Sequence, residues 1–168
     1  MNEIDFALLL LRVWAGVVML AHGINHARSQ EGTAKWFEDV GFRSPRLNAM
    51  ISAGNEIAIG VALIAGLLTA VAAAAVAATM LVAFWSIHRF VGFFVFKRPT
   101  EGYEYVVTLV VVAVAIGILG PGSISVDSAL GLADDLDGTV GALIVGLGLL
   151  AGAGQLAMFW RRPAGDRR

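Results

Sequence analysis

Long apolar stretches separated by short polar ones dominate this chain. The apolar runs fall at about 4–27, 45–68, 69–96, 103–119 and 139–160. A helix needs about 20 apolar residues to cross the hydrocarbon core of a membrane, and these runs have about that length. The pattern therefore predicts an all-α membrane protein in which five helices form a bundle.

A short amphipathic segment separates the first two runs. Trp36, Phe37 and Val40 recur at helical spacing, and Gly41 follows them as a residue that can end a helix. A short helix with one apolar face and a polar remainder lies along the membrane interface instead of crossing it. We expect such an interfacial helix near 33–41.

Basic residues indicate how the bundle is oriented. Apart from Arg12, which lies inside the first span, they are Arg28, Lys35, Arg43, Arg46, Arg89, Lys97, Arg98, Arg161, Arg162, Arg167 and Arg168. With five spans these residues all fall on one side, and the acidic loop around Asp134 falls on the other. Since cytoplasmic loops carry an excess of Lys and Arg, we expect the N-terminus outside and the C-terminus in the cytoplasm.

Composition supports the membrane assignment and excludes several chemistries. Hydrophobic residues make up 58% of the chain and charged residues only 15%, whereas soluble domains carry about 25% charged residues. The formal net charge of -1 gives no reason to expect a nucleic-acid partner. Because there is no cysteine, disulfides, iron–sulfur clusters and cysteine-bound zinc are excluded. A haem or metal would have to be held by histidine or carboxylate.

Ionisable side chains interrupt the apolar runs in the predicted cytoplasmic half of the membrane. They are His22, His26, Glu56, His88 and Glu104. Such groups are costly in a membrane, so each is a candidate functional residue. The alternatives are ordinary ones: a histidine at the interface, a cation at a helix end, or a His–Glu pair that only locks two helices together.

Two chemistries suit these residues. His22 and His26 lie one helical turn apart and could share a metal with Glu56. Alternatively, His22, Glu56, His88 and Glu104 could surround a quinone, bind its carbonyl groups and relay the protons that its reduction needs. We expect a quinone first, with haem or a non-haem metal as the alternatives.

Two further features have structural interpretations. Arg12 lies inside the first span, and Asp127 follows the Gly120-Pro121-Gly122 break on the same predicted outer side, so the two could form an ion pair. In the last run, three glycines could form a flat face for close helix packing, and through it the protein could bind partner proteins or a second copy of itself. They are Gly141, Gly148 and Gly152.

Several of these residues resemble the motifs of the DoxX family of small bacterial and archaeal membrane proteins. The matching residues, in the family's order, are Arg12, Gly16, His22-Gly23, Glu56, Gly60, Gly66, His88, Glu104-Tyr105, Gly120-Pro121-Gly122, Ser125 and Asp127. The resemblance covers about residues 6–128. His26 stands where many relatives carry a lysine, and the last span is an addition to the four-span family core.

The resemblance implies a domain organisation and a set of functions. Residues 1–128 would form the four-helix core, 129–160 the acidic loop and fifth helix, and 161–168 a basic cytoplasmic tail. Some relatives are subunits of a thiosulfate:quinone oxidoreductase, and others belong to redox or oxidative-stress assemblies. We therefore expect a multi-pass protein of a prokaryotic inner or plasma membrane that handles quinone as a redox-associated subunit. A non-catalytic accessory subunit of a larger complex and a small-molecule or ion carrier are the alternatives.

Overall fold

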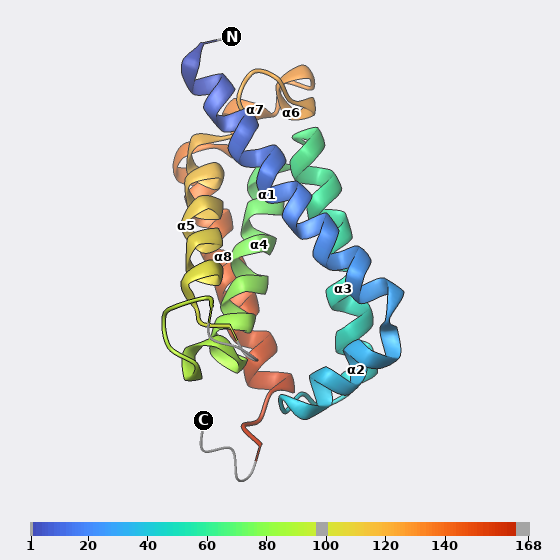
Figure 1. The fold of residues 1–168 in the computed structure, drawn as a ribbon. Coiled ribbons are helices and arrows are strands. Elements are labelled where there is room, and N and C mark those ends of the chain that lie inside the picture. The colour runs from blue at the N-terminus through green and yellow to red at the C-terminus, as the bar shows by residue number, and fades with distance from the viewer. Residues whose placement is uncertain (1, 97–100, 164–168) are drawn as a thin grey trace.

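The chain forms a helical bundle in a computed structural model, which describes residues 2–96 and 101–163. The helices are α1 (Glu3–Arg28), α2 (Gln30–Asp39), α3 (Pro45–Ala65), α4 (Thr69–Ser86), the 3-10 helix η1 (His88–Phe90), α5 (Glu104–Leu119), α6 (Val126–Ala129), α7 (Ala133–Leu136) and α8 (Gly138–Phe159) (Figure 1). Within the described residues, the remaining regular structure is a single bridge between Phe42 and Trp160. The all-α prediction is confirmed.

Four of the described helices are long and apolar enough to cross a membrane: α1, α3, α4 and α8. The fifth, α5, has 16 residues and is therefore only about 24 Å long, somewhat short of the roughly 30 Å hydrocarbon core. It is nevertheless apolar and packs against both α4 and α8. The bundle thus contains four candidate spans and one shorter apolar helix.

The third predicted span is too long, because α4 ends at Ser86 and not near residue 96. The chain turns at Gly92, whose φ is 103°, and folds back. The carbonyl groups of residues 92–94 then accept hydrogen bonds from the N–H groups of residues 102–104. Those donors lie at the start of α5, where a helix cannot satisfy them itself. The predicted basic end of this span, residues 97–99, lies outside the described residues.

The bundle consists of two groups of helices (Figure 1). One group pairs α1 with α3 and carries α2 on α3, and the other contains α4, α5 and α8. Glycines bring α1 close to α3: an added Cβ on Gly16 would lie 2.9 Å from the carbonyl oxygen of Gly60, and one on Gly23 would lie 2.9 Å from the Cβ of Glu56. Helix packing in membranes depends on such small residues, because they let two backbones approach.

The glycine face of α8 is occupied within the chain. Gly141 lies against the backbone of Gly117 in α5, and Gly152 lies against Ala78 in α4, where an added Cβ would be 2.8 Å from the carbonyl oxygen. Gly148 lies against Ala74 in the same way. The face that we predicted as a partner surface therefore packs against α4 and α5, since the van der Waals fit that glycine provides is used inside the bundle.

A backbone junction joins the end of α8 to the loop between α2 and α3. The N–H of Arg43 donates to the carbonyl of Phe159 (2.7 Å), and the N–H of Arg161 donates to the carbonyl of Gly41 (2.9 Å). The apolar face of α2 covers this junction through Phe37, which is 6% exposed. Trp36, which we predicted on the same face, is 42% exposed and points away. A short helix thus lies close to the predicted position, and it packs on protein through a narrower face than predicted.

Arg12 and Asp127 do not form the predicted ion pair, because the connection between α3 and α4 lies between them. The Arg12 guanidinium donates to the carbonyl oxygens of Leu63 (2.9 Å) and Ile64 (3.1 Å). The Asp127 carboxylate accepts from the N–H groups of Leu68 (2.7 Å) and Thr69 (2.8 Å). Arg12 and Asp127 are each 1% exposed. The two charges therefore stabilise one turn from opposite sides.

Candidate functional site

His26 of α1 and Glu56 of α3 form the centre of the polar cluster. The Nδ1 atom of His26 lies 3.1 Å from the Oε2 atom of Glu56. The Glu56 side chain is 5% exposed and the His26 side chain 24% exposed. The two atoms approach as an ion pair without the alignment of a hydrogen bond. Gly23 permits this approach, because it lies directly against Glu56 and Ile57.

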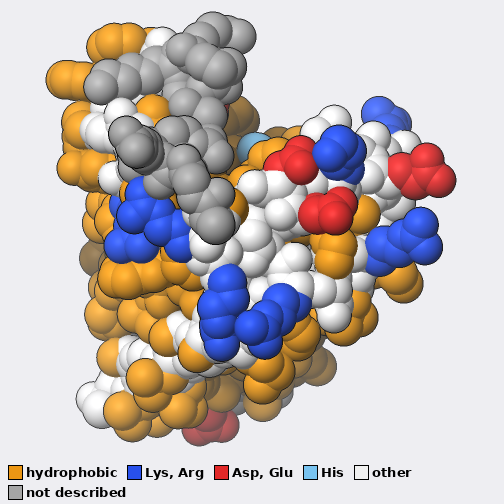
Figure 2. All heavy atoms as spheres, turned by 90° about the horizontal axis from the view of Figure 1, so that it is seen from below, with side chains coloured by type: hydrophobic (Ala, Val, Ile, Leu, Met, Phe, Trp, Pro, Cys, Tyr) orange, Lys and Arg blue, Asp and Glu red, His pale blue; other side chains and the backbone are white. Residues whose placement is uncertain are grey.

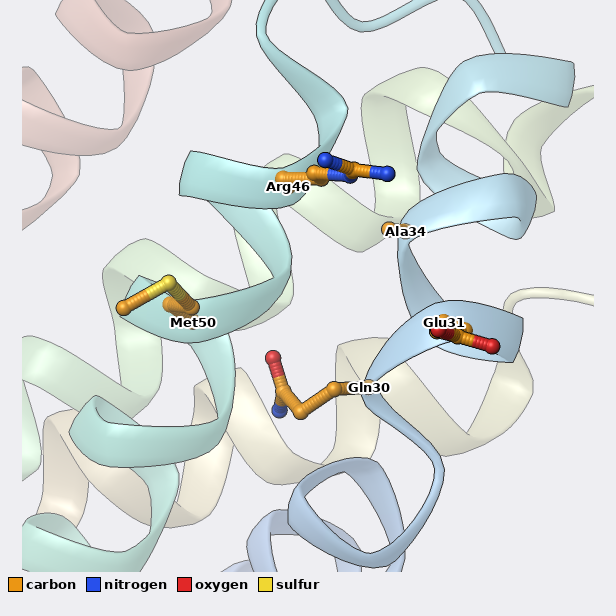
Figure 3. A pocket seen from close by; sticks show the side chains of 5 residues that line it. All are labelled: Gln30, Glu31, Ala34, Arg46 and Met50. Carbon is orange, nitrogen blue, oxygen red and sulfur yellow. The ribbon is translucent and has the colours of Figure 1, made fainter.

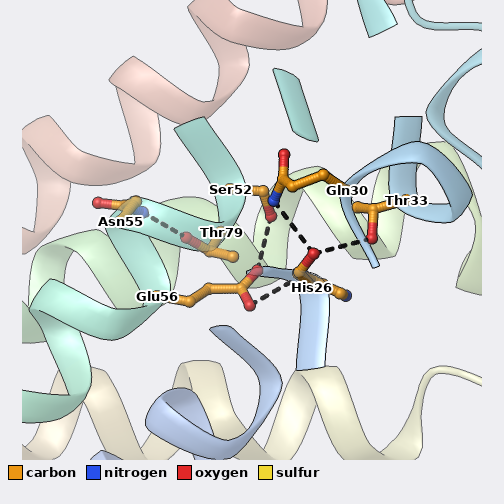
Figure 4. A network of polar contacts seen from close by, with 7 residues as sticks. All are labelled: His26, Gln30, Thr33, Ser52, Asn55, Glu56 and Thr79. Carbon is orange, nitrogen blue, oxygen red and sulfur yellow. Dashed lines mark hydrogen bonds and ion pairs between the residues drawn. The ribbon is translucent and has the colours of Figure 1, made fainter. Parts of the chain in front are cut away.

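A polar network fixes this pair in place (Figure 4). Ser52, one turn before Glu56, donates from its hydroxyl to the Oε1 atom of Glu56 at 2.7 Å. Gln30 and Thr33 of α2 donate to the backbone carbonyl of His26 at 3.1 and 3.3 Å. Helix α2 therefore holds the end of α1, and α3 holds the carboxylate, so both partners of the pair are oriented by neighbours.

His22 extends the cluster toward α5. Its ring centroid lies 6.2 Å from that of Tyr105 at an interplanar angle of 24°, which is a stacked contact. The same ring lies 6.3 Å from the His26 ring, edge to face. Tyr105, His22, His26 and Glu56 therefore form a continuous line of side chains from α5 to α3. Tyr105 was not among the predicted site residues, although its place in the Glu104-Tyr105 motif was a signal for it.

An open groove lies beside His22. It has a volume of about 370 Å³. Its lining residues are Trp14, Val17, Val18, Ala21, His22, Val95, Glu101 and Tyr105, and we call it the His22 groove. Trp14 is 68% exposed and Val17 is 41% exposed on the outer surface of α1. The groove is therefore mostly apolar and opens on the face that lipid would cover.

A smaller polar hollow reaches His26 from the α1–α2 corner. Its volume is about 280 Å³. The residues that line it are Asn25, His26, Ser29, Gly32, Thr33 and Trp36. His26 thus lies between this hollow and His22.

His88 and Glu104 lie at the rim of the His22 groove and not in the central cluster. The Nδ1 atom of His88 lies 2.7 Å from the carbonyl oxygen of Glu101. A carboxylate oxygen of Glu104 accepts a hydrogen bond from the N–H of Val95 at 3.3 Å. Because Glu101 and Val95 line the groove, His88 and Glu104 hold its wall. Of the five predicted residues, His22, His26 and Glu56 therefore form a line beside the groove. His88 and Glu104 support the rim of the groove.

One comparison with known proteins gives a match. A family model described as DoxX matches residues 7–89. The chain is therefore a DoxX-family membrane protein. The match is shorter than the predicted 6–128 and takes in α1 to α4, with His22, His26 and Glu56. No curated protein and no solved structure matches the chain.

The DoxX region does not assemble the predicted metal ligands. Among the described residues, no group of three or more His, Cys, Asp or Glu side chains is placed to hold a metal ion. His26 reaches Glu56, but His22 turns toward Tyr105 and meets His26 edge to face.

The DoxX region also contains a hollow away from the cluster. It lies between α2 and α3, has a volume of about 620 Å³ and is lined by Gln30, Glu31, Ala34, Arg46 and Met50 (Figure 3). None of the predicted site residues lines it. Gln30 connects it to the cluster only through the hydrogen bond to the His26 carbonyl.

Proposed function

We propose that this DoxX protein is a quinone-handling subunit of a membrane redox assembly. In this proposal the quinone headgroup binds in the His22 groove, and the His26–Glu56 pair supplies protons to it. The observation that carries the proposal is the row of neighbouring side chains from Glu56 through His26 and His22 to Tyr105, which ends at a groove open to lipid.

The His22 groove has the properties that a quinone headgroup requires. Quinones dissolve in the membrane, so their site must open to lipid, as this groove does past Trp14 and Val17. The Trp14 and Tyr105 rings offer flat surfaces for a planar headgroup. The Tyr105 hydroxyl and the His22 imidazole can donate hydrogen bonds to its carbonyl oxygens.

The proton chemistry follows from the order of the side chains. Reduction of a quinone to a quinol takes up two electrons and two protons. The electrons would come from a donor on a partner protein, since the chain has no cysteine with which to hold an iron–sulfur cluster. The protons would enter through the polar hollow at His26, pass to His22 and reach the quinone oxygens. Glu56 would stabilise the positive charge on His26 while a proton is in transit.

The orientation proposed for the protein fits this path. Lysine and arginine side chains gather at the end of the molecule that carries α2, as Figure 2 shows, and His26 lies near that end. We propose that this end faces the cytoplasm of a prokaryote and that the N-terminus lies outside. The protons would then be taken from the cytoplasm.

The two alternatives are less well supported. The accessory-subunit alternative relied on a free glycine face, and that face packs against α4 and α5. A carrier needs a path across the membrane, whereas the line of side chains that starts at Tyr105 ends at Glu56 and its hydrogen-bond partner Ser52 on α3.

Trp14 makes the proposal testable in the purified protein, because it lines the proposed site. A short-chain quinone should quench the tryptophan fluorescence of the wild type. The part of this quenching that comes from Trp14 should be absent in Trp14→Phe. His22→Leu should weaken quinone binding about tenfold or more, because a donor hydrogen bond and the stack on Tyr105 are lost. The matched control Trp36→Phe lies outside the groove and should leave the binding curve unchanged. Equal quenching in the wild type and in Trp14→Phe would show that the quinone binds elsewhere.

A further inference from the structure

A second groove runs between α4 and α8 at the end of the bundle where the arginines gather. It has a volume of about 540 Å³. Its lining residues are Leu81, Trp85, Ala153, Leu156, Ala157, Trp160, Arg161 and Arg162, and we call it the Trp160 groove. These described lining residues include two arginines and no acidic side chain. The groove is separate from the His22 groove and shares no lining residue with it.

A third arginine joins the two tryptophans at the mouth of this groove. The guanidinium carbon of Arg89 lies 4.0 Å from the centre of the Trp85 ring and 5.9 Å from that of Trp160. Its Nε donates to the Trp85 carbonyl at 2.8 Å. Trp85 belongs to α4 and Trp160 follows α8. The positively charged guanidinium of Arg89 therefore lies between the α4 wall and the α8 wall of the groove.

Arg161 and Arg162 carry their charges to the same mouth. The Nη1 atom of Arg161 donates to the carbonyl groups of Ala157 (2.9 Å) and Trp160 (2.7 Å). Within the described part of the chain these contacts use Nη1 alone, so the Nε and Nη2 groups are available to a ligand. The Arg162 guanidinium carbon lies 4.6 Å from the Phe90 ring centre. Three guanidinium groups therefore surround one end of an otherwise apolar groove.

We propose that the Trp160 groove binds an anionic phospholipid. The phosphate would contact Arg89, Arg161 and Arg162, because guanidinium groups bind phosphate with paired, charge-assisted hydrogen bonds. One acyl chain would lie along α4 and α8 over Leu81, Ala153 and Ala157. The side chains of the two alanines are small and leave room for it. Basic pockets between membrane helices and tryptophans at the interface are typical of such lipid sites. A zwitterionic lipid would bring its own cation toward three arginines and would bind less tightly.

Native mass spectrometry of the full chain can test this assignment. The delipidated protein is titrated with phosphatidylglycerol or with phosphatidylcholine of the same acyl chains. We expect at least one phosphatidylglycerol to bind about tenfold more tightly than phosphatidylcholine. Each basic residue contributes about fivefold to the affinity for an anionic lipid, so the double change Arg161→Gln and Arg162→Gln should weaken phosphatidylglycerol binding about 25-fold. The double change Arg43→Gln and Arg46→Gln removes the same charge at the α2–α3 corner and should leave binding almost unchanged.

A second pair of variants tests the apolar part of the groove without changing charge. Ala153→Trp would fill it and should remove the tightly bound lipid, whereas Ala151→Trp, on an exposed position of α8 that does not line the groove, should not. The proposal fails if phosphatidylglycerol and phosphatidylcholine bind equally, if both double arginine variants weaken binding alike, or if Ala153→Trp retains the lipid. It also fails if inorganic phosphate or a long-chain quinone displaces the lipid at equal concentration.

Discussion

His26 on α1 lies 3.1 Å from Glu56 on α3, and Glu56 is the more deeply buried of the two. A buried carboxylate in a membrane is destabilising unless a charge or hydrogen bonds compensate it. Here Ser52 supplies a hydrogen bond, and His26 supplies a charge when its imidazole is protonated. The pair is therefore held by neighbours on both sides, with its more exposed member toward the polar hollow.

The contact between α1 and α3 depends on Gly23, so we predict that Gly23→Ala destabilises the protein. The added Cβ would lie 2.9 Å from the Glu56 Cβ, closer than two carbon atoms can pack. Overpacking of this kind costs about 1–3 kcal/mol. Unfolding in a denaturing detergent, followed by circular dichroism, measures the change.

Gly54→Ala is the matched control for this change. Gly54 lies in α3, and an added Cβ there meets nothing within 4 Å. Alanine favours helix over glycine by up to about 1 kcal/mol, so this variant should be as stable as the wild type or more stable. If the two alanine variants behave alike, the close packing at Gly23 does not hold α1 against α3.

The turn between α3 and α4 should depend jointly on Arg12 and Asp127. Arg12→Met removes the guanidinium that donates to the carbonyl groups of Leu63, Ile64 and Ile124, and should cost about 3 kcal/mol or more. Asp127→Asn keeps the shape but can accept from only one of two N–H groups, and should cost about 1–3 kcal/mol. Because both side chains bind the same turn, the double variant should lose less stability than the sum of the losses in the two single variants. Strict additivity in the double-mutant cycle would contradict a shared turn.

The packing of α8 inside the bundle gives a further prediction. Gly148→Leu should destabilise the protein strongly, because Gly148 lies against the backbone of Ala74, whereas Gly146→Leu should be tolerated, since an added Cβ there meets nothing within 4 Å. Thermal unfolding in detergent, together with the mass of the particle by light scattering, separates the two roles. A Gly148→Leu variant that stays stable and only changes its oligomeric state would indicate that the glycine face binds a partner.

The proposed orientation can be tested by labelling single cysteines, because the chain has none of its own. A membrane-impermeant maleimide applied to intact cells should label Asp134→Cys in the acidic loop. Ser29→Cys, between α1 and α2, should be labelled only after the cells are opened. The reverse pattern would invert the topology and place the polar hollow at His26 outside.

Apolar run lengths predicted most of the fold, but not where one helix ends. Runs of nearly membrane-spanning length gave α1, α3, α5 and α8 to within a few residues. The end of α4 was predicted wrongly because the segment after Ser86 is also largely apolar. The helix breaks at Ile87, whose backbone is not helical (φ −131°, ψ −67°), and the chain then turns at Gly92. Hydrophobicity reports burial in lipid or protein and does not reveal such a turn.

The site was predicted in part, because depth along a helix can be estimated from the sequence and rotation about its axis cannot. His22 was predicted beside Glu56 in both candidate sites, and His26 in the metal site alone. The crossing of α1 over α3 at Gly23 instead presents His26 to Glu56 and turns His22 toward Tyr105. Opposite charges predicted that Arg12 and Asp127 would act together, but only the structure shows that a backbone turn lies between them.

The most direct test of the proposed function is whether Glu56 responds when a quinone in the His22 groove is reduced. Reduction of the bound quinone at an electrode, followed by infrared difference spectroscopy, detects a change in protonation or hydrogen bonding of a carboxyl group. We predict a carboxyl signal in the wild type that is lost in Glu56→Gln and retained in Glu104→Gln, which changes a carboxylate at the groove rim. A signal that survives in Glu56→Gln, or a reduced quinone that produces none in the wild type, would contradict the role of the His26–Glu56 pair.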